Sequence, residues 1–167
     1  MTQSSEMAIR VRMLGADDWQ LWRKLRLEAL EEAPYAFSSK LADWQGDGDT
    51  EARWRARLSA VPINLVAELY EMPAGMVSAT AQNLSGTVEL ISMWVAPFAR
   101  GRGVGDHLVS AVVKWAQEQQ AARIVLAVLE GNEAAAALYL RHGFVDGEAS
   151  TQDCSGMARE RQMVRDL

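Results

Sequence analysis

Arg100-Gly101-Arg102-Gly103-Val104-Gly105 joins an expected strand, residues 87–95, to an expected amphipathic helix that begins near Val104. Glycine lacks a Cβ, so three glycines at alternate positions let a ligand approach the backbone closely. The first turn of the following helix carries unpaired N–H groups and a partial positive charge. The segment therefore predicts a site for a phosphate or pyrophosphate, to which Arg100 and Arg102 can add charge-assisted contacts.

Two common phosphate-binding motifs do not fit this loop. The Walker pattern G-x-x-x-x-G-K-[ST] is absent, and the dinucleotide fingerprint G-x-G-x-x-G requires glycine where the chain has Asp106. Two other interpretations stay open, a basic turn without a ligand and a phosphate- or nucleic-acid-binding domain. The net charge of −5 argues against a duplex-DNA binder, so we expect no nucleic-acid partner.

Outward from the loop, hydrophobic periodicity predicts helices and strands along the rest of the chain. The expected helices run from Asp17 or Asp18 to Pro34, from Asp49 or Thr50 to Pro62, from about 104 to 119 and from about 132 to 142. The expected strands cover 8–14, 63–70, 76–84, 87–95, 124–129, 144–148 and 159–164, with a turn at Pro73-Ala74-Gly75 and a loop over 35–48. The three strands between 63 and 95 are expected to form an antiparallel meander.

Composition bounds the class of protein. The 167 residues suit one domain, residues 1–167 with a flexible segment 1–7, and an apolar fraction of 49% excludes a disordered chain. No apolar run reaches the ~18–20 residues of a membrane span, and the first six residues lack the features of a signal peptide. A single cysteine, Cys154, cannot form an internal disulfide. We therefore expect a cytoplasmic protein without a membrane partner.

Two further segments share a pattern with the loop. The loop resembles the R/Q-x-x-G-x-G/A acyl-CoA motif of the GNAT (GCN5-related N-acetyltransferase) superfamily, and Val95-Ala96-Pro97 before it is similar to the family's V-x-P. Residues 131–144 resemble the family's N-x-x-A-x-x-L-Y-x-x-x-G-F, with Asn132 and Tyr139 at motif positions. These motifs cover about residues 87–145, in the family order. The resemblance implies an α/β fold with a mixed, mostly antiparallel sheet and helices on both faces.

The resemblance also implies a function. The chain would be an N-acetyltransferase that moves an acetyl group from acetyl-CoA, its cosubstrate, to a primary amine by direct attack. The acceptor would be an amine-bearing small molecule or peptide, and a homodimer is possible because dimers are frequent in the family. The alternative is a non-catalytic acyl-CoA-binding sensor or regulatory module.

The same resemblance assigns roles residue by residue. Backbone N–H groups would hold the CoA pyrophosphate, and they belong to Arg100, Gly101, Arg102, Gly103, Val104, Gly105 and Asp106. The pantetheine arm would pair with Met93, Trp94 and Val95, at a free edge where two parallel strands of the family fold separate. Asn132 would contact the pantetheine chain, and Tyr139 would lie near the thioester sulfur.

Two side chains carry the expected chemistry. A phenol with a pKa of about 10 stays protonated at neutral pH, so Tyr139 can deliver a proton to the leaving thiolate; the alternative is a tyrosine packed in the core. An attacking amine must be neutral, and Glu89, six residues before Val95, is the predicted base. Strict alternation puts Glu89 on the face of Ile91, Met93 and Val95, whereas a bulge would change that parity. The alternative for Glu89 is an exposed strand residue. Ser92 and Glu130 are weaker candidates for the base, and many family members have no unique base.

No metal site is predicted. The acidic run from Asp47 resembles the start of a calcium loop, but Ala52 and Leu58 occupy the positions where such a loop needs glycine and glutamate. His107 and His142 lie 35 residues apart without a cysteine or carboxylate pattern.

The acidic side chains within 28–32 and 43–51 form either a solvated surface or an acceptor site that attracts amines.

Overall fold

The computed structural model describes residues 8–34, 40–147 and 160–167. The segment 1–7, expected to be flexible, and Cys154 lie outside the described residues. Along the chain the elements are β1 (Ile9–Met13), α2 (Trp19–Glu32), α3 (Glu51–Ala60), β2 (Ile63–Leu69), β3 (Met72–Ala79), β4 (Thr87–Val95), α4 (Val104–Glu118), β5 (Arg123–Leu129), α5 (Glu133–Arg141), β6 (Val145–Asp146) and β7 (Glu160–Asp166). Short 3-10 turns are η1 (Ala16–Asp18), η3 (Leu41–Trp44), η4 (Gly46–Gly48) and η5 (Pro97–Ala99).

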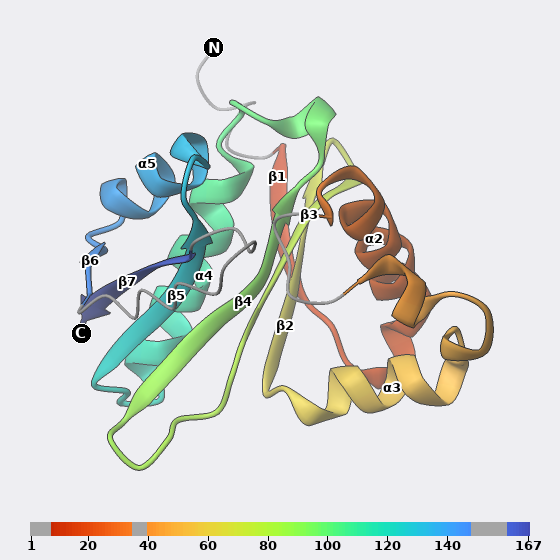
Figure 1. Cartoon of the computed structure of the whole chain (residues 1–167), viewed down its shortest axis with the longest axis horizontal. Coiled ribbons are helices and arrows are strands. Elements are labelled where there is room, and N and C mark those ends of the chain that lie inside the picture. The colour runs from red at the N-terminus through yellow and green to blue at the C-terminus, as the bar shows by residue number, and fades with distance from the viewer. Residues whose placement is uncertain (1–7, 35–39, 148–159) are drawn as a thin grey trace, which may run out of the picture.

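The strands form one mixed sheet in the order β1-β2-β3-β4-β5-β7-β6. Every neighbouring pair within the described residues is antiparallel except β4 and β5, which run parallel. The expected meander of β2, β3 and β4 is confirmed. The predicted fold class, a mixed and mostly antiparallel sheet with helices on both faces, is confirmed as well (Figure 1).

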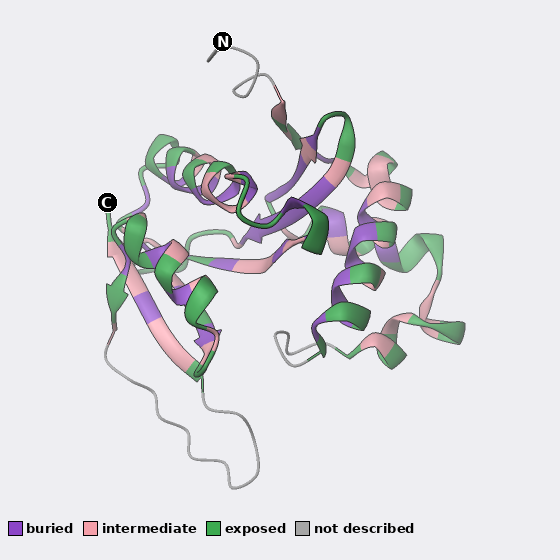
Figure 2. Cartoon of the chain, turned by 90° about the horizontal axis from the view of Figure 1, so that it is seen from above, coloured by how far each residue is buried: buried purple, intermediate pink, exposed green. Residues whose placement is uncertain are grey.

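Two apolar clusters cover opposite faces of the sheet. The α4 helix places Val104, Leu108 and Val112 one turn apart, and this stripe packs against the sheet together with the inner face of α5. The α2 helix packs Trp22 and Leu25 with α3 against the other face. Figure 2 shows the buried residues turned inward from both sides. Because burying a large apolar side chain contributes about 1.5–3 kcal/mol, both stripes stabilise the sheet between them.

The hairpin between β2 and β3 corrects one prediction. The turn lies at Tyr70 and Glu71, which both have positive φ (49° and 67°), and Pro73-Ala74-Gly75 belongs to the strand. The register shifts between Ala67 and Glu68, so the β3 segment carries an extra residue at this point. A bulge is a place where a strand tolerates proline, because a ladder hydrogen bond is already missing there. Pro73-Ala74-Gly75 therefore marks a bulge in β3 and not the hairpin turn.

Other boundaries differ from the expectations in smaller ways. The strand expected over 76–84 begins at Met72 and ends at Ala79, because residues 83–87 close a turn around the Asn83 side chain. The expected loop contains η3 and η4 within its described part, and η1 precedes α2. The C-terminal strands are β6, which has two residues, and β7, which begins at Glu160. The start of α3 agrees with the expected one, and Thr50 caps the helix by accepting a hydrogen bond from the Arg53 backbone N–H.

Candidate active site

A cavity of about 580 Å³ lies where the two parallel strands separate. Residues Thr87–Glu89 of β4 pair with Arg123–Val125 of β5, and beyond these residues the two strands diverge (Figure 1). The cavity is lined on one side by residues 90–95 of β4 and on the other by residues 127–129 of β5. Strand edges that face such a gap offer N–H and C=O groups that an extended ligand can pair with.

A bulge in β4 sets which side chains face this cavity. Ser92 has a φ of 56°, and the register with β3 shifts between Met76 and Ser78. Ile91 is paired with Ser78, on the α2 and α3 face, whereas Met93 packs in the cluster on the α4 face. The parity expected from strict alternation is therefore wrong, and the bulge is the reason. Glu89 shares a face with Ile91 but not with Met93.

The glycine loop forms the end of the cavity next to α4. Gly101 and Gly103 have positive φ values of 74° and 88°, and Gly103 is the N-cap of α4 without a side-chain cap. The first N–H groups of α4 thus have no side-chain acceptor from the cap residue, which leaves them for an anion. At Gly105 a Cβ would lie 3.0 Å from Leu138 Cδ2, so glycine lets α5 pack closely beside the start of α4.

The two arginines of the loop have different surroundings. Arg100 lines the cavity, and its guanidinium donates to Glu32 Oε2 (2.7 Å) and to the Val95 carbonyl (3.0 Å). Trp94 Nε1 donates to the same Glu32 oxygen at 2.9 Å. The hydrogen bond from Arg100, with that from Trp94, holds the pKa of Glu32 below its usual value. Arg102 is exposed and does not line the cavity.

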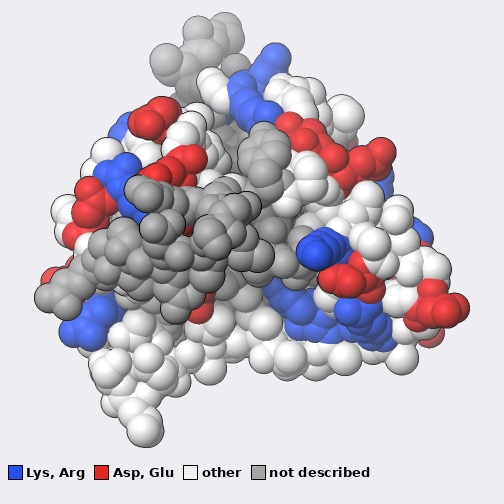
Figure 3. Space-filling model, in the orientation of Figure 1, with Lys and Arg blue, Asp and Glu red and all other residues white. Residues whose placement is uncertain are grey.

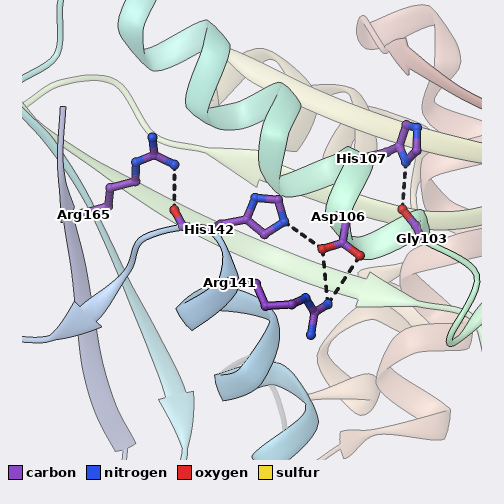
Figure 4. A network of polar contacts seen from close by, with 6 residues as sticks. All are labelled: Gly103, Asp106, His107, Arg141, His142 and Arg165. Carbon is purple, nitrogen blue, oxygen red and sulfur yellow. Dashed lines mark hydrogen bonds and ion pairs between the residues drawn. The ribbon is translucent and has the colours of Figure 1, made fainter.

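Asp106 connects the two helices at this end of the cavity (Figure 4). Its carboxylate lies 2.8 Å from His142 Nε2 and 3.2 Å from an Arg141 guanidinium nitrogen. Burial alone would raise the pKa of Asp106, but the hydrogen bonds from His142 and Arg141 lower it below its usual value. Arg141 and Asp106 both line the cavity, so this ion pair forms part of its wall.

Asn132 and Tyr139 lie on α5 and line the same cavity. Asn132 caps the helix with its Oδ1, 3.3 Å from the Ala135 N–H, which leaves the Nδ2 donors for a ligand. Tyr139 is 5% exposed and stacks edge-on against Phe144. Burial raises the pKa of Tyr139, so its phenol keeps its proton throughout the neutral range.

The cavity therefore brings together most of the residues named from the sequence. Among the described candidates these are Met93, Trp94, Val95, Arg100, Gly101, Gly103, Val104, Gly105, Asp106, Asn132 and Tyr139. Trp94 contributes its backbone to the cavity lining, because its ring is buried in the apolar cluster between the sheet and α2 and α3. Glu89 is exposed and lies outside the lining, with its backbone N–H donated to Thr80 Oγ1. Of the weaker candidates, Ser92 lines the cavity and Glu130 does not.

One wall residue, Arg141, escapes sequence reasoning, because it carries no distinguishing local pattern and only its contact with Asp106 shows its position. Glu32 lies outside the lining, and the sequence placed it only in the acidic segment 28–32; its contact with Arg100 connects it to the wall. The acidic segments are partly engaged in structure: Glu32 binds Arg100, and Asp49 binds Arg23. Figure 3 shows acidic and basic side chains interspersed over α2 and α3 on this face. This mixture does not form a single acidic field.

The described residues contain neither a candidate membrane-spanning helix nor a candidate metal cluster. No helix among them has the length and apolar character that a membrane crossing requires. Within the same ranges, no group of three or more His, Cys, Asp or Glu side chains is arranged to hold a metal ion.

Comparison with known proteins identifies one family whose profile matches this chain. The sequence profile of the Acetyltransferase (GNAT) family matches residues 19–144. No curated protein sequence matches the chain.

Several solved structures of acetyltransferases share the fold of this chain. One similar structure is an acetyltransferase of the GNAT family from Streptococcus pneumoniae, 23% identical with a TM-score of 0.76, covering 95% of this chain and 99% of that chain. A ribosomal-protein-S5-alanine acetyltransferase from Vibrio fischeri is 16% identical with a TM-score of 0.77, covering 95% and 93%. The PaiA N-acetyltransferase from Thermoplasma acidophilum, in complex with coenzyme A, is 15% identical with a TM-score of 0.72, covering 96% and 100%.

Proposed function

Because the chain belongs to the acetyltransferase (GNAT) family, we propose that it is an N-acetyltransferase that moves an acetyl group from acetyl-CoA to a primary amine. One observation carries the proposal: the gap between β4 and β5 runs from the glycine loop to Tyr139. A pyrophosphate at the start of α4 and a thioester near Tyr139 would be the two ends of one extended ligand. The helix N-terminus suits the anionic end, and the free β4 edge suits the amide-bearing arm.

The proposed chemistry needs no covalent enzyme intermediate. The neutral amine attacks the thioester carbonyl, the C–N bond forms, and the C–S bond breaks to release the thiolate of CoA. Tyr139 gives its proton to that thiolate and is reprotonated from solvent; burial raises its pKa, which keeps the phenol protonated at neutral pH but makes the transfer itself less favourable. The amine proton leaves through water toward Glu89, which is exposed on the face of the sheet that α2 and α3 cover. Much of the rate enhancement would come from holding the two substrates in register.

Thermal unfolding with and without acetyl-CoA tests the donor site. A ligand at about 100 times its Kd stabilises by about 2.7 kcal/mol, a shift of about 5–10 °C for a chain of this size. ATP and 3′-dephospho-CoA are the controls, since the proposal expects acetyl-CoA to exceed ATP by a wide margin. No shift at millimolar acetyl-CoA would contradict the proposal.

A panel of amines, scored by release of free thiol, then tests turnover. The panel should include peptides with free N-termini, lysine side chains, polyamines, aminoglycosides and amino acids. Thiol release that depends on an amine supports the enzyme. Acetyl-CoA binding without release on any amine would instead favour the acyl-CoA-binding sensor.

A further inference from the structure

An arginine on α3 contacts three strands of the sheet. Arg57 of α3 donates to Asn64 Oδ1 on β2 (3.0 Å), to Ser78 Oγ on β3 (3.3 Å) and to Ser92 Oγ on β4 (3.1 Å). Its guanidinium carbon also lies 5.2 Å from the centroid of the buried Trp22 ring. All three oxygens are neutral, so this partly buried cation serves as a hydrogen-bond donor that connects the three strands.

Two of the three residues that accept hydrogen bonds from Arg57, Asn64 and Ser78, are themselves held by further hydrogen bonds. Asn64 is 1% exposed, and its Nδ2 donates to the carbonyls of Leu58 (3.0 Å) and Val61 (3.1 Å). The Ser78 hydroxyl, fully buried, donates to Asn64 Oδ1 at 2.7 Å. With these groups fixed, the Arg57 guanidinium has a defined place from which it meets Ser92.

Ser92 is in a conformation that a serine adopts only at a cost. Of the described non-glycine residues with positive φ, Tyr70, Glu71 and Gln120 lie in turns or at a helix end, and Ser92 alone lies inside a strand. A left-handed conformation costs an L-residue about 1–2 kcal/mol. The bulge at Ser92 lies just beyond the last paired residue, Glu89, at the point where β4 leaves β5 and begins to line the cavity. A bulge bends its strand and increases its twist, and this bend lies next to the point where the two strands separate.

We propose that Arg57 is a positioning residue, whose hydrogen bond to the Ser92 hydroxyl holds the β4 bulge in its left-handed conformation and so keeps the slot between β4 and β5 open for the acyl-CoA arm. The inference rests on the proposed acetyl-CoA site. Without the contact, Ser92 relaxes toward an ordinary extended strand, and only a fraction of molecules presents the open slot. The apparent Kd for acetyl-CoA rises by the inverse of that fraction.

Three single substitutions test this assignment by acetyl-CoA binding, measured by calorimetry. Ser92→Ala removes the hydroxyl and keeps the Cβ, so the affinity should fall about 5- to 30-fold, the factor that corresponds to 1–2 kcal/mol. Ser92→Gly also removes the hydroxyl, but glycine adopts positive φ without strain, so it should bind at least about threefold more tightly than Ser92→Ala. Ser59→Ala is the control: it removes the hydroxyl of an exposed residue of α3 outside the cavity lining, so acetyl-CoA binding should match that of the wild type.

The order of affinities is decisive because glycine normally destabilises a strand relative to alanine. Binding by Ser92→Ala as tight as by Ser59→Ala would overturn the assignment, as would Ser92→Gly binding no better than Ser92→Ala. Arg57→Met checks the partner: it should weaken binding when residue 92 is serine and have little further effect in the Ser92→Ala background. If Arg57→Met does not fold, the Ser92 series decides alone. Failure of the wild-type protein to bind acetyl-CoA removes the proposed function and this inference together, whereas normal wild-type binding with an unaffected Ser92→Ala removes the inference only.

Discussion

Gly101 permits a measurement of what the loop conformation contributes to stability and binding. Gly101 has a φ of +74°, and a Cβ built on it meets nothing within 4 Å. In Gly101→Ala the cost is therefore conformational and not steric, and it amounts to about 1–2 kcal/mol. Gly15 is the matched control, because a Cβ there also meets nothing within 4 Å and its φ is −108°. Gly15→Ala should change the free energy of unfolding by no more than about 0.5 kcal/mol.

The conformational cost of Gly101→Ala should appear either in the Tm of the free protein or in its Kd for acetyl-CoA. If the free loop keeps its left-handed conformation, Tm falls by about 2–8 °C and the affinity for acetyl-CoA is preserved. If the loop relaxes in the free protein, Tm is preserved and the Kd for acetyl-CoA rises about 5- to 30-fold. Calorimetric Tm and titration of both variants distinguish these outcomes. A Gly101→Ala protein that matches Gly15→Ala in both Tm and Kd would refute the reasoning.

Three further predictions concern the acid, the ion pairs and the core. Tyr139→Phe keeps the buried ring and removes the proton donor, so kcat should fall about 10²- to 10⁴-fold with acetyl-CoA binding unchanged, while the exposed Tyr70→Phe behaves as wild type in the thiol-release assay. Hydrogen bonds from Arg23 and Trp54 lower the pKa of Asp49 from 3.8 to about 2, so its contribution to stability is present above about pH 4 and is lost as the pH falls through 2. Acid unfolding of Asp49→Asn, followed by circular dichroism, should therefore show a flatter stability profile between pH 4 and 2, and an unchanged slope would contradict the ion pair. Phe144→Ala removes a fully buried ring and should cost about 3–5 kcal/mol in urea unfolding, well above the effect of Val145→Ala at the exposed neighbouring position.

The binding groups were predictable where they depend on local backbone. The positive φ at Gly101 and Gly103, the uncapped start of α4 and the helical spacing of Asn132 and Tyr139 all follow from short-range rules. A loop that leads into a helix carries its N–H donors with it, whatever surrounds it. For this reason the pattern of residues 100–106 predicts an anion site independently of any tertiary contact.

The less predictable features depend on contacts between distant segments. Glu32 meets Arg100 across 68 positions, and Arg57 meets Ser92 across 35. The bulge at Ser92 reversed the parity expected for Met93, because a single extra residue in a strand inverts every side chain after it. Pro73 misled the prediction of the hairpin turn for the same reason: a bulge and a turn share the same local residues.

By itself, the sequence determined the order of helices and strands, the two apolar stripes and the loop that suits a pyrophosphate, since each depends on periodicity or backbone freedom within a few residues. Only the tertiary structure decided that β4 and β5 separate after Glu89, that Glu89 lies outside the cavity, and that Arg57 and Glu32 hydrogen-bond to residues of its wall. These features arise where strands and helices far apart in the chain are brought into contact, and the balance of packing and hydrogen bonding among them is a property of the whole fold.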